Sequence, residues 1–373
     1  MTNIHNERIK IAKEKKINYD LRSPIEFYLA ERKKNKNLEP KFLYNKEFSD
    51  FDVIKKAKGK NSIIPFRGPI NKQSVSCAED LKYRIVENDK YGFKNNNNIY
   101  EKNINAILIG DSYAEGICEI SKNDIAGNLI KKNINTVNLG ITGAGPLLTL
   151  AALREFGTFF KPQNVFYLYF EGNDLEDLEF EKKQSYLIKY LNDNHKVNYI
   201  KRLEEVKLLL KQAKIESESR LLQAVNNKNI SKEIKKEKKF IPYIKDIAEL
   251  SNIKNILRYT IFKKQEKKFD LDLFYTVVDK MNYETKKWNG NFYVVYVPSW
   301  SRYFTKFTNK DSGIKLKDQI TNNLQKKNIN VIDLTIFFNN EKNIKSYFPL
   351  GYVGHYNYKG YAKIADLIYE NME

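Results

Sequence analysis

The chain has 373 residues, of which 42% are hydrophobic and 13% aromatic, and its formal net charge at pH 7 is +19. This composition excludes an intrinsically disordered chain and allows one large domain, or two small ones, with a sizeable core. The lysines are spread along the chain and mixed with asparagine and acidic residues. We therefore interpret most of them as solvated surface and not as a nucleic-acid interface.

The sequence predicts neither a membrane-spanning helix nor a signal peptide. No run approaches the ~18 apolar residues that a membrane helix needs, and no apolar segment follows the basic residues at the N-terminus. Cys77 and Cys118 are the only cysteines, which are too few for a zinc site built on cysteines. They either pair in an oxidising compartment or remain two buried thiols.

Residues 1–60 are polar and lack a strong period, so we expect an N-terminal extension. Residues 61–103 are rich in proline, glycine and asparagine and are expected to be irregular or hairpin-like. Apolar runs then alternate with helical patterns, a succession typical of βαβ units and a parallel sheet. The expected strands are 104–109, 136–139, 164–170, 291–297 and 330–334, and the expected helices are 123–131, 147–156 and 361–369.

A long insertion, residues 180–288, separates the third and fourth expected strands. An amphipathic helix is expected in it, because apolar residues recur at steps of three and four. They are Leu203, Val206, Leu210 and Ala213. Residues 231–270 hold 12 Lys/Arg against 6 Asp/Glu, a net charge of +6. We interpret this stretch as a solvated helical cap; a face for an anionic substrate or a membrane surface is the alternative. The expected α/β core is then 61–179 together with 289–373.

The segment Gly110-Asp111-Ser112, with Gly116 four residues later, follows the first apolar run. It describes a strand that ends in a tight turn, presents a hydroxyl and enters a helix. Ligands of open α/β sheets bind at the carboxyl ends of the strands, and a helix N-terminus favours negative charge. Ser112 is therefore a candidate nucleophile, and the alternative is a serine that only caps the helix.

Further polar residues follow the next strands: Gly143 after the second, Asn173 and Asp174 after the third, and His355 before the last helix. A parallel sheet brings such positions to one rim. A serine hydroxyl needs a base such as histidine, and the oxyanion formed on ester attack needs donors. The N–H groups of Ser112 and Gly143 and the Asn173 amide are candidate donors.

Each of these residues also has a structural interpretation. Asp111 can bond N–H groups of its own turn, Asn173 can be a turn residue, and Asp174 can cap the helix that follows. His5 and His195 lie in polar surroundings and are expected to be solvated. The acidic residues near position 173 lack a neighbouring histidine or cysteine, so we predict no metal site and no cofactor.

These blocks resemble the SGNH/GDSL hydrolase family. The resemblance rests on Gly110-Asp111-Ser112 with Gly116, on Asn138 followed by Gly143, on Gly172-x-Asp174 enclosing Asn173, and on the late His355. Residues 77–93 also resemble the segment that precedes the first block in a bacterial, envelope-associated subgroup. The resemblance implies a flavodoxin-like three-layer α/β/α sandwich with a parallel sheet.

In this family Ser112 would be the nucleophile, His355 the general base, and Ser112, Gly143 and Asn173 the oxyanion hole, with Asp111 and Asp174 in support. One position departs from the pattern. The family places an aspartate three residues before the histidine, where this chain has Tyr352. We expect a backbone carbonyl of the 349–353 loop to orient the ring instead, giving a Ser–His dyad with reduced activity or none.

The sequence thus predicts a serine-dependent ester hydrolase acting on O-acyl (acetyl) groups of carbohydrate or lipid. One alternative is an O-acyltransferase that modifies an envelope polysaccharide. Another is a catalytically weakened binding module that uses the basic insertion. The expected partner is an acylated carbohydrate or lipid and not a nucleic acid. The resemblance suggests the cell envelope or periplasm, with peripheral association as an option, whereas the sequence as it stands suggests the cytoplasm.

Overall fold

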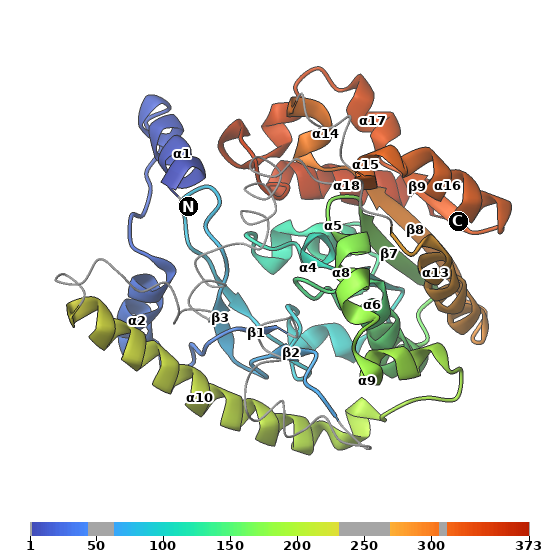
Figure 1. The fold of residues 1–373 in the computed structure, drawn as a ribbon, viewed down its shortest axis with the longest axis horizontal. Helices are drawn as coiled ribbons and strands as arrows, with labels where there is room; N and C mark the ends of the chain where they lie inside the picture. Colours follow the sequence, from blue (N-terminus) through green and yellow to red (C-terminus); the bar gives the residue numbers. More distant parts are fainter. Residues whose placement is uncertain (1, 44–62, 231–268, 306–311, 373) are drawn as a thin grey trace.

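The computed structural model describes residues 2–43, 63–230, 269–305 and 312–372. Its centre is a five-stranded sheet in the spatial order β6-β5-β7-β8-β9, with every pair of neighbours parallel (Figure 1). The strands are β5 (Ala106–Gly110), β6 (Thr136–Asn138), β7 (Asn164–Phe170), β8 (Asn291–Val297) and β9 (Asn330–Asp333). The predicted α/β class, parallel sheet and five strands are confirmed.

Helices cover both faces of this sheet. One face packs against α5 (Ile125–Lys131) and α18 (Tyr358–Asn371), and the other against α6 (Pro146–Ala152) and α13 (Leu271–Lys286). Every residue of β5 and β7 is buried, which explains why these strands are continuous apolar runs and do not alternate. The sheet order changes direction between β5 and β7, the kind of position where open α/β sheets bind ligands.

Two helix boundaries differ from the sequence expectation for local reasons. The helix expected over 147–156 ends at Ala152 and continues through a wider π turn, Leu153–Gly157, into α7 (Thr158–Phe160). The closing helix begins at Tyr358, before the expected 361, because the Asn357 side chain accepts the backbone N–H groups of Lys359 and Gly360.

The N-terminal part forms small elements beside the sheet (Figure 1). Its helices are α1 (Thr2–Glu14) and α2 (Pro24–Lys34), and its strands are β1 (Phe42–Leu43), β2 (Arg67–Gly68), β3 (Gln73–Val75) and β4 (Ile85–Glu87). Strands β3 and β4 pair antiparallel, as expected for a hairpin-like segment. The short helices α14 (Trp300–Phe304), α15 (Ser312–Lys315), α16 (Lys317–Lys326) and α17 (Thr335–Asn340) belong to the C-terminal part.

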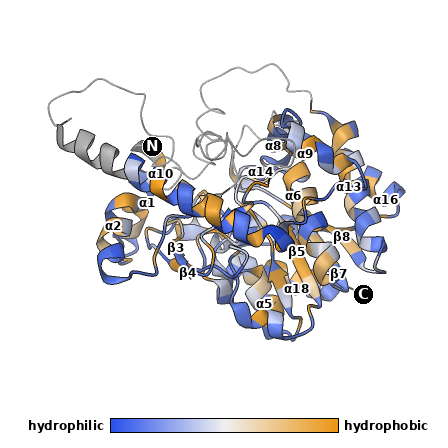
Figure 2. Cartoon of the chain, turned by 90° about the horizontal axis from the view of Figure 1, so that it is seen from below, coloured by the Kyte–Doolittle hydropathy of each residue, from blue (hydrophilic) through white to orange (hydrophobic). Residues whose placement is uncertain are grey.

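The range predicted as an insertion contains α8 (Asp174–Glu181) in part, α9 (Ser185–Ile188), α10 (Leu203–Ile230) and α13. The predicted amphipathic helix is confirmed, because Val206, Leu210 and Ala213 are buried on α10, along which hydrophilic and hydrophobic residues alternate (Figure 2). Most of the basic stretch lies outside the described residues. No helix in the described ranges is long and apolar enough to cross a membrane.

Helix α13 contributes to the main core although it lies within 180–288, since Phe274, Val277 and Met281 are all fully buried. We expect Met281→Ala to lower the free energy of unfolding by about 2–5 kcal/mol, because it removes a buried side chain and leaves a cavity. Tyr283→Ala is the matched control, since Tyr283 lies on the same helix and is 54% exposed. Urea denaturation of both variants measures the difference, and equal stability would place α13 outside the cooperative core.

Candidate active site

Ser112 lies at the carboxyl edge of the sheet, immediately after β5. The strand ends at Gly110, and the Asp111 carboxylate accepts the backbone N–H of Tyr113 at 2.8 Å, which caps the short helix α4 (Ser112–Glu115). Ser112 is therefore the first helical residue, with its hydroxyl fixed by the turn. Its side chain is 4% exposed.

His355 lies in the loop that precedes α18 and meets Ser112 across 243 residues of sequence. The Nε2 atom of the ring is 2.8 Å from the Ser112 Oγ, a hydrogen-bond distance. Asn357 fixes this loop, because its amide donates to the carbonyl oxygens of Ser346 and Phe348 while its side-chain oxygen caps α18. The Tyr113 ring packs 4.7 Å from the imidazole, centre to centre.

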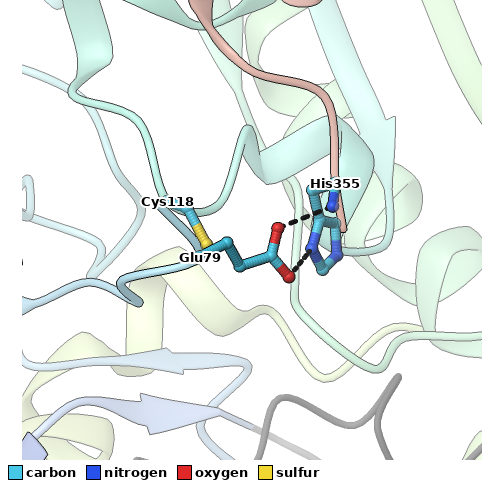
Figure 3. Close-up of side chains that lie close together, drawn as sticks. All are labelled: Glu79, Cys118 and His355. Carbon is cyan, nitrogen blue, oxygen red and sulfur yellow. Dashed lines mark hydrogen bonds and ion pairs between the residues drawn. The ribbon is translucent and has the colours of Figure 1, made fainter. Parts of the chain in front are cut away.

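The residue that holds the other side of the ring is Glu79, from the loop between β3 and β4 (Figure 3). Its Oε1 is 3.1 Å from His355 Nδ1, and its Oε2 accepts the His355 backbone N–H at 2.6 Å. Both oxygens of one buried carboxylate thus orient the histidine. A Cβ at Gly354 would lie 2.5 Å from Oε2, so glycine permits this approach.

The expectation that a backbone carbonyl of the 349–353 loop orients the ring is therefore wrong. Carbonyls of this loop turn toward the N-terminal helix: that of Leu350 accepts Lys15 Nζ, and that of Val353 accepts Arg8 Nη2, both at 2.8 Å. Tyr352, at the position where the resemblance places an aspartate, packs near Trp300. The carboxylate comes from a segment 276 residues earlier in the chain.

A disulfide between Cys77 and Cys118 joins the Glu79 loop to the segment just after α4. Of the two alternatives left by the sequence, the structure has the bonded one. The cross-link begins two residues before Glu79 and ends six residues after Ser112, so it ties together the segments that carry both groups. Sequence reasoning missed Glu79, although Cys77 and the family resemblance of residues 77–93 both marked its segment.

The charges around the ring favour an ionised Glu79. Burial raises the pKa of a carboxyl, but the neighbouring imidazole and the Arg8 guanidinium outweigh burial and hold the pKa of Glu79 below its usual value. Arg8 Nη2 lies 3.7 Å from Glu79 Oε1, and both side chains are buried. Asp111 differs: burial raises its pKa to about 6 despite the bond from Tyr113.

The three candidate oxyanion donors lie on loops that follow adjacent strands: Ser112 after β5, Gly143 after β6 and Asn173 after β7. The Ile141 N–H donates to the Gly110 carbonyl at 2.9 Å, so the second loop runs beside the first. Glu115 of α4 accepts both the N–H and the hydroxyl of Thr142, at 3.2 and 2.7 Å, next to Gly143, whose φ is 80°.

Asn173 and Asp174 connect β7 to α8. The Asn173 Nδ2 donates to Asp177 Oδ2 at 2.7 Å, while its Oδ1 is buried and unpartnered among the described residues. Asn173 is the N-cap residue and Asp174 the first residue of the helix, so Asp174 is not the cap. Asp174 instead accepts the Tyr167 hydroxyl at 2.8 Å, and burial, followed by the charge of Asp111, raises its pKa well above the usual value.

The remaining histidines lie as expected or nearly so, and Asp366, eleven residues after His355, is not near the ring. His5 is exposed on α1, His195 is half-buried against Tyr190, and Asp366 pairs with Lys132 on the outer side of α18. Glu79, Cys118 and His355 offer ligand atoms within 4.8 Å of one another. Because the Cys118 sulfur is bonded to Cys77 and the carboxylate is bonded to the ring, we interpret this group as a hydrogen-bonded relay and not as a metal centre.

Comparison with known proteins gives a likeness in structure alone. No family model and no curated protein matches the chain. Among solved structures, the chain is similar to a candidate lipolytic protein of the G-D-S-L family from Desulfitobacterium hafniense DCB-2, with 13% identity and a TM-score of 0.39. The match covers 72% of this chain and 100% of the other. A likeness of this size identifies neither a family nor an activity.

The disulfide is open to a direct test. We expect the double variant Cys77→Ser, Cys118→Ser to lose about 2–4 kcal/mol of unfolding free energy in urea, because the cross-link restricts the unfolded chain. The wild type, unfolded without reductant and treated with an alkylating agent, should show no free thiol by mass spectrometry. Two alkylated cysteines in that sample would contradict the assignment, and reduced wild type is the control.

Proposed function

We propose that the chain is a serine-dependent ester hydrolase of the SGNH/GDSL type. The observation that carries the proposal is the buried series Glu79–His355–Ser112, with 3.1 Å from carboxylate to Nδ1 and 2.8 Å from Nε2 to Oγ. A nucleophile bonded to a base that is itself oriented by a third group is the arrangement of serine hydrolases on unrelated folds.

In the first step Ser112 Oγ attacks the ester carbonyl while His355 Nε2 takes the hydroxyl proton. Glu79 fixes the tautomer in which Nδ1 carries the other proton, because its carboxylate can only accept when ionised. It also stabilises the imidazolium that forms. The bond from Glu79 to the His355 backbone N–H keeps the loop in place throughout, since it does not depend on the state of the ring.

The tetrahedral intermediate places negative charge on the former carbonyl oxygen. The backbone N–H groups of Ser112 and Gly143 and the Asn173 amide are the proposed donors, and losing one such donor typically costs about 10²–10³ in rate. The protonated His355 then gives its proton to the leaving alcohol, and an acyl-enzyme remains on Ser112. Water, deprotonated by His355, attacks the acyl carbon and releases the acid.

The substrate class follows from the resemblance of the sequence blocks: O-acyl, and foremost acetyl, esters of carbohydrate or lipid. Transfer to a sugar hydroxyl shares every step up to the acyl-enzyme. The binding-module alternative depended mainly on the missing aspartate, and Glu79 removes that support. The Cys77–Cys118 disulfide supports an oxidising compartment such as the cell envelope, where disulfides persist.

The nucleophile is tested with a short-chain aryl ester. We expect Ser112→Ala to lower kcat/KM at least ~10³-fold with little change in stability, because only the attacking oxygen is removed. Ser346→Ala is the control, since that hydroxyl bonds a carbonyl of an exposed loop. Continuous detection of the released phenol measures both variants. Full activity in the alanine variant would show that another group performs the attack.

The acid is tested by removing its charge. Glu79→Gln keeps the size of the side chain but supplies an amide that can select the wrong ring tautomer, so we expect kcat to fall about 10²–10⁴-fold. The adjacent Asp80→Asn is the matched control, because Asp80 pairs with Arg84 and its side chain is partly exposed. Equal kcat values for the two variants would argue for a Ser–His dyad.

A further inference from the structure

Helix α1 brings a buried cation to the proposed triad from outside the sheet. Arg8 is 5% exposed although it belongs to a surface helix at the start of the chain (Figure 1). Burying a guanidinium is costly unless it is paired and hydrogen-bonded. Among the described residues, Arg8 pairs with Glu79, 3.7 Å away, and donates to the carbonyl of Val353, 2.8 Å away. Both belong to the machinery around His355.

One of these contacts acts on the backbone that carries the histidine, and the other acts on the residue that holds its ring. Val353 lies two residues before His355, so its bond to Arg8 holds the backbone that presents the ring. Glu79 holds the ring itself, and its pKa stays below the usual value because the His355 imidazole and, after it, the Arg8 guanidinium outweigh burial. Gly354, between the two contacts, leaves room for both the carboxylate and the guanidinium: a Cβ there would lie 2.5 Å from Glu79 Oε2 and 3.2 Å from Arg8 Nη2.

We propose that Arg8 is a positioning residue of the active site, and that α1 completes the triad by clamping Glu79 and the His355 loop through it. The inference rests on the proposed function and extends it to a residue far from the sequence blocks. Arg8 contacts the Glu79 carboxylate and the Val353 carbonyl. It acts through the carboxylate and the carbonyl that hold the ring.

The charge of Arg8 also opposes protonation of the Glu79–His355 pair. Other titratable groups also face the pair or Arg8, and none of them is mutated in the Arg8 and Lys15 variants. They are Asp111, Tyr113, Tyr361, Arg84 and His5. When Arg8 is replaced by methionine, the pair holds a proton at higher pH, because a nearby cation is lost. The acid limb of the pH profile of kcat/KM should therefore move upward by about 1 pH unit.

The experiment compares Arg8→Met, Arg8→Lys and Lys15→Met in the full chain, with the aryl ester as substrate. Lys15 is the matched control, because it bonds the Leu350 carbonyl of the same loop from an exposed position. For Arg8→Met we expect the acid limb of the kcat/KM profile to move to higher pH and kcat to be about 10-fold lower. Arg8→Lys, which keeps the charge, should return the limb toward wild type, and Lys15→Met should leave it unchanged.

A double-mutant cycle shows whether Arg8 acts through Glu79. In a Glu79→Gln background, Arg8→Met should lower kcat less than about 3-fold, because coupled residues are not additive. An unchanged limb for Arg8→Met, or the same loss of kcat in both backgrounds, overturns the inference. If Arg8→Met unfolds, Arg8→Gln takes its place in both measurements, because it removes the charge at position 8 and keeps a polar side chain, and an unchanged pH midpoint of the His355 titration in Arg8→Gln overturns the inference.

The failure of the proposed function is recognised separately. In a chain with His5→Asn and His195→Asn, His355 is the sole histidine, and its imidazole can be titrated by NMR without any substrate. If Arg8→Met raises the pH midpoint of the His355 titration and Lys15→Met does not, the proposed role of Arg8 is supported. This holds even if Ser112→Ala keeps full esterase activity, a result that would refute only the hydrolase proposal. A midpoint that does not respond to Arg8→Met overturns the clamp, whatever the activity.

Discussion

The arrangement around Ser112 depends on one buried carboxylate. Glu79 accepts the backbone N–H of His355 with one oxygen and faces its ring with the other, so a single side chain sets both the loop and the imidazole. A desolvated carboxylate in this position is stable only with compensating partners. The histidine and the Arg8 guanidinium are these partners, and the glycine at position 354 leaves space for the carboxylate to approach.

The sheet places residues that are distant in sequence at one edge. Parallel strands end at one edge, so Ser112, Gly143 and Asn173, on the loops after β5, β6 and β7, lie at the same edge of the sheet without any local sequence relation. The N-terminal segments then close this edge from the other side, with the disulfide fixing the Glu79 loop and α1 covering the His355 loop. A segment that looks like an extension in sequence is thus part of the proposed site.

Features set by local sequence patterns could be predicted, whereas contacts set by the path of the whole chain could not. The bounds of β7 and β8 match the apolar runs 164–170 and 291–297, because strands buried on both faces need continuous apolar residues. Ser112 and His355 stand in recognisable local patterns, and their proximity follows from the sheet. Glu79 lies in an irregular segment, and its partner is set by the tertiary path of the chain, which no local pattern encodes.

The family that the sequence blocks resemble places an aspartate three residues before the histidine, where this chain has Tyr352. The carbonyls of Leu350 and Val353 in that loop accept Lys15 and Arg8 and do not face the ring nitrogen that Glu79 holds. The physical requirement, an acceptor for the second ring nitrogen, was correct, and only its source was wrong. The sequence therefore predicts the chemical role, an acceptor for the second ring nitrogen, more reliably than it predicts which residue fills that role.

Covalent labelling with a fluorophosphonate, followed by peptide mass spectrometry, tests the central claim most directly, because the reagent reports a nucleophilic serine without requiring the natural substrate. The account predicts one adduct, on Ser112, that disappears in a folded His355→Ala variant. An adduct on another serine, or a correctly folded wild type that remains unlabelled, would contradict it.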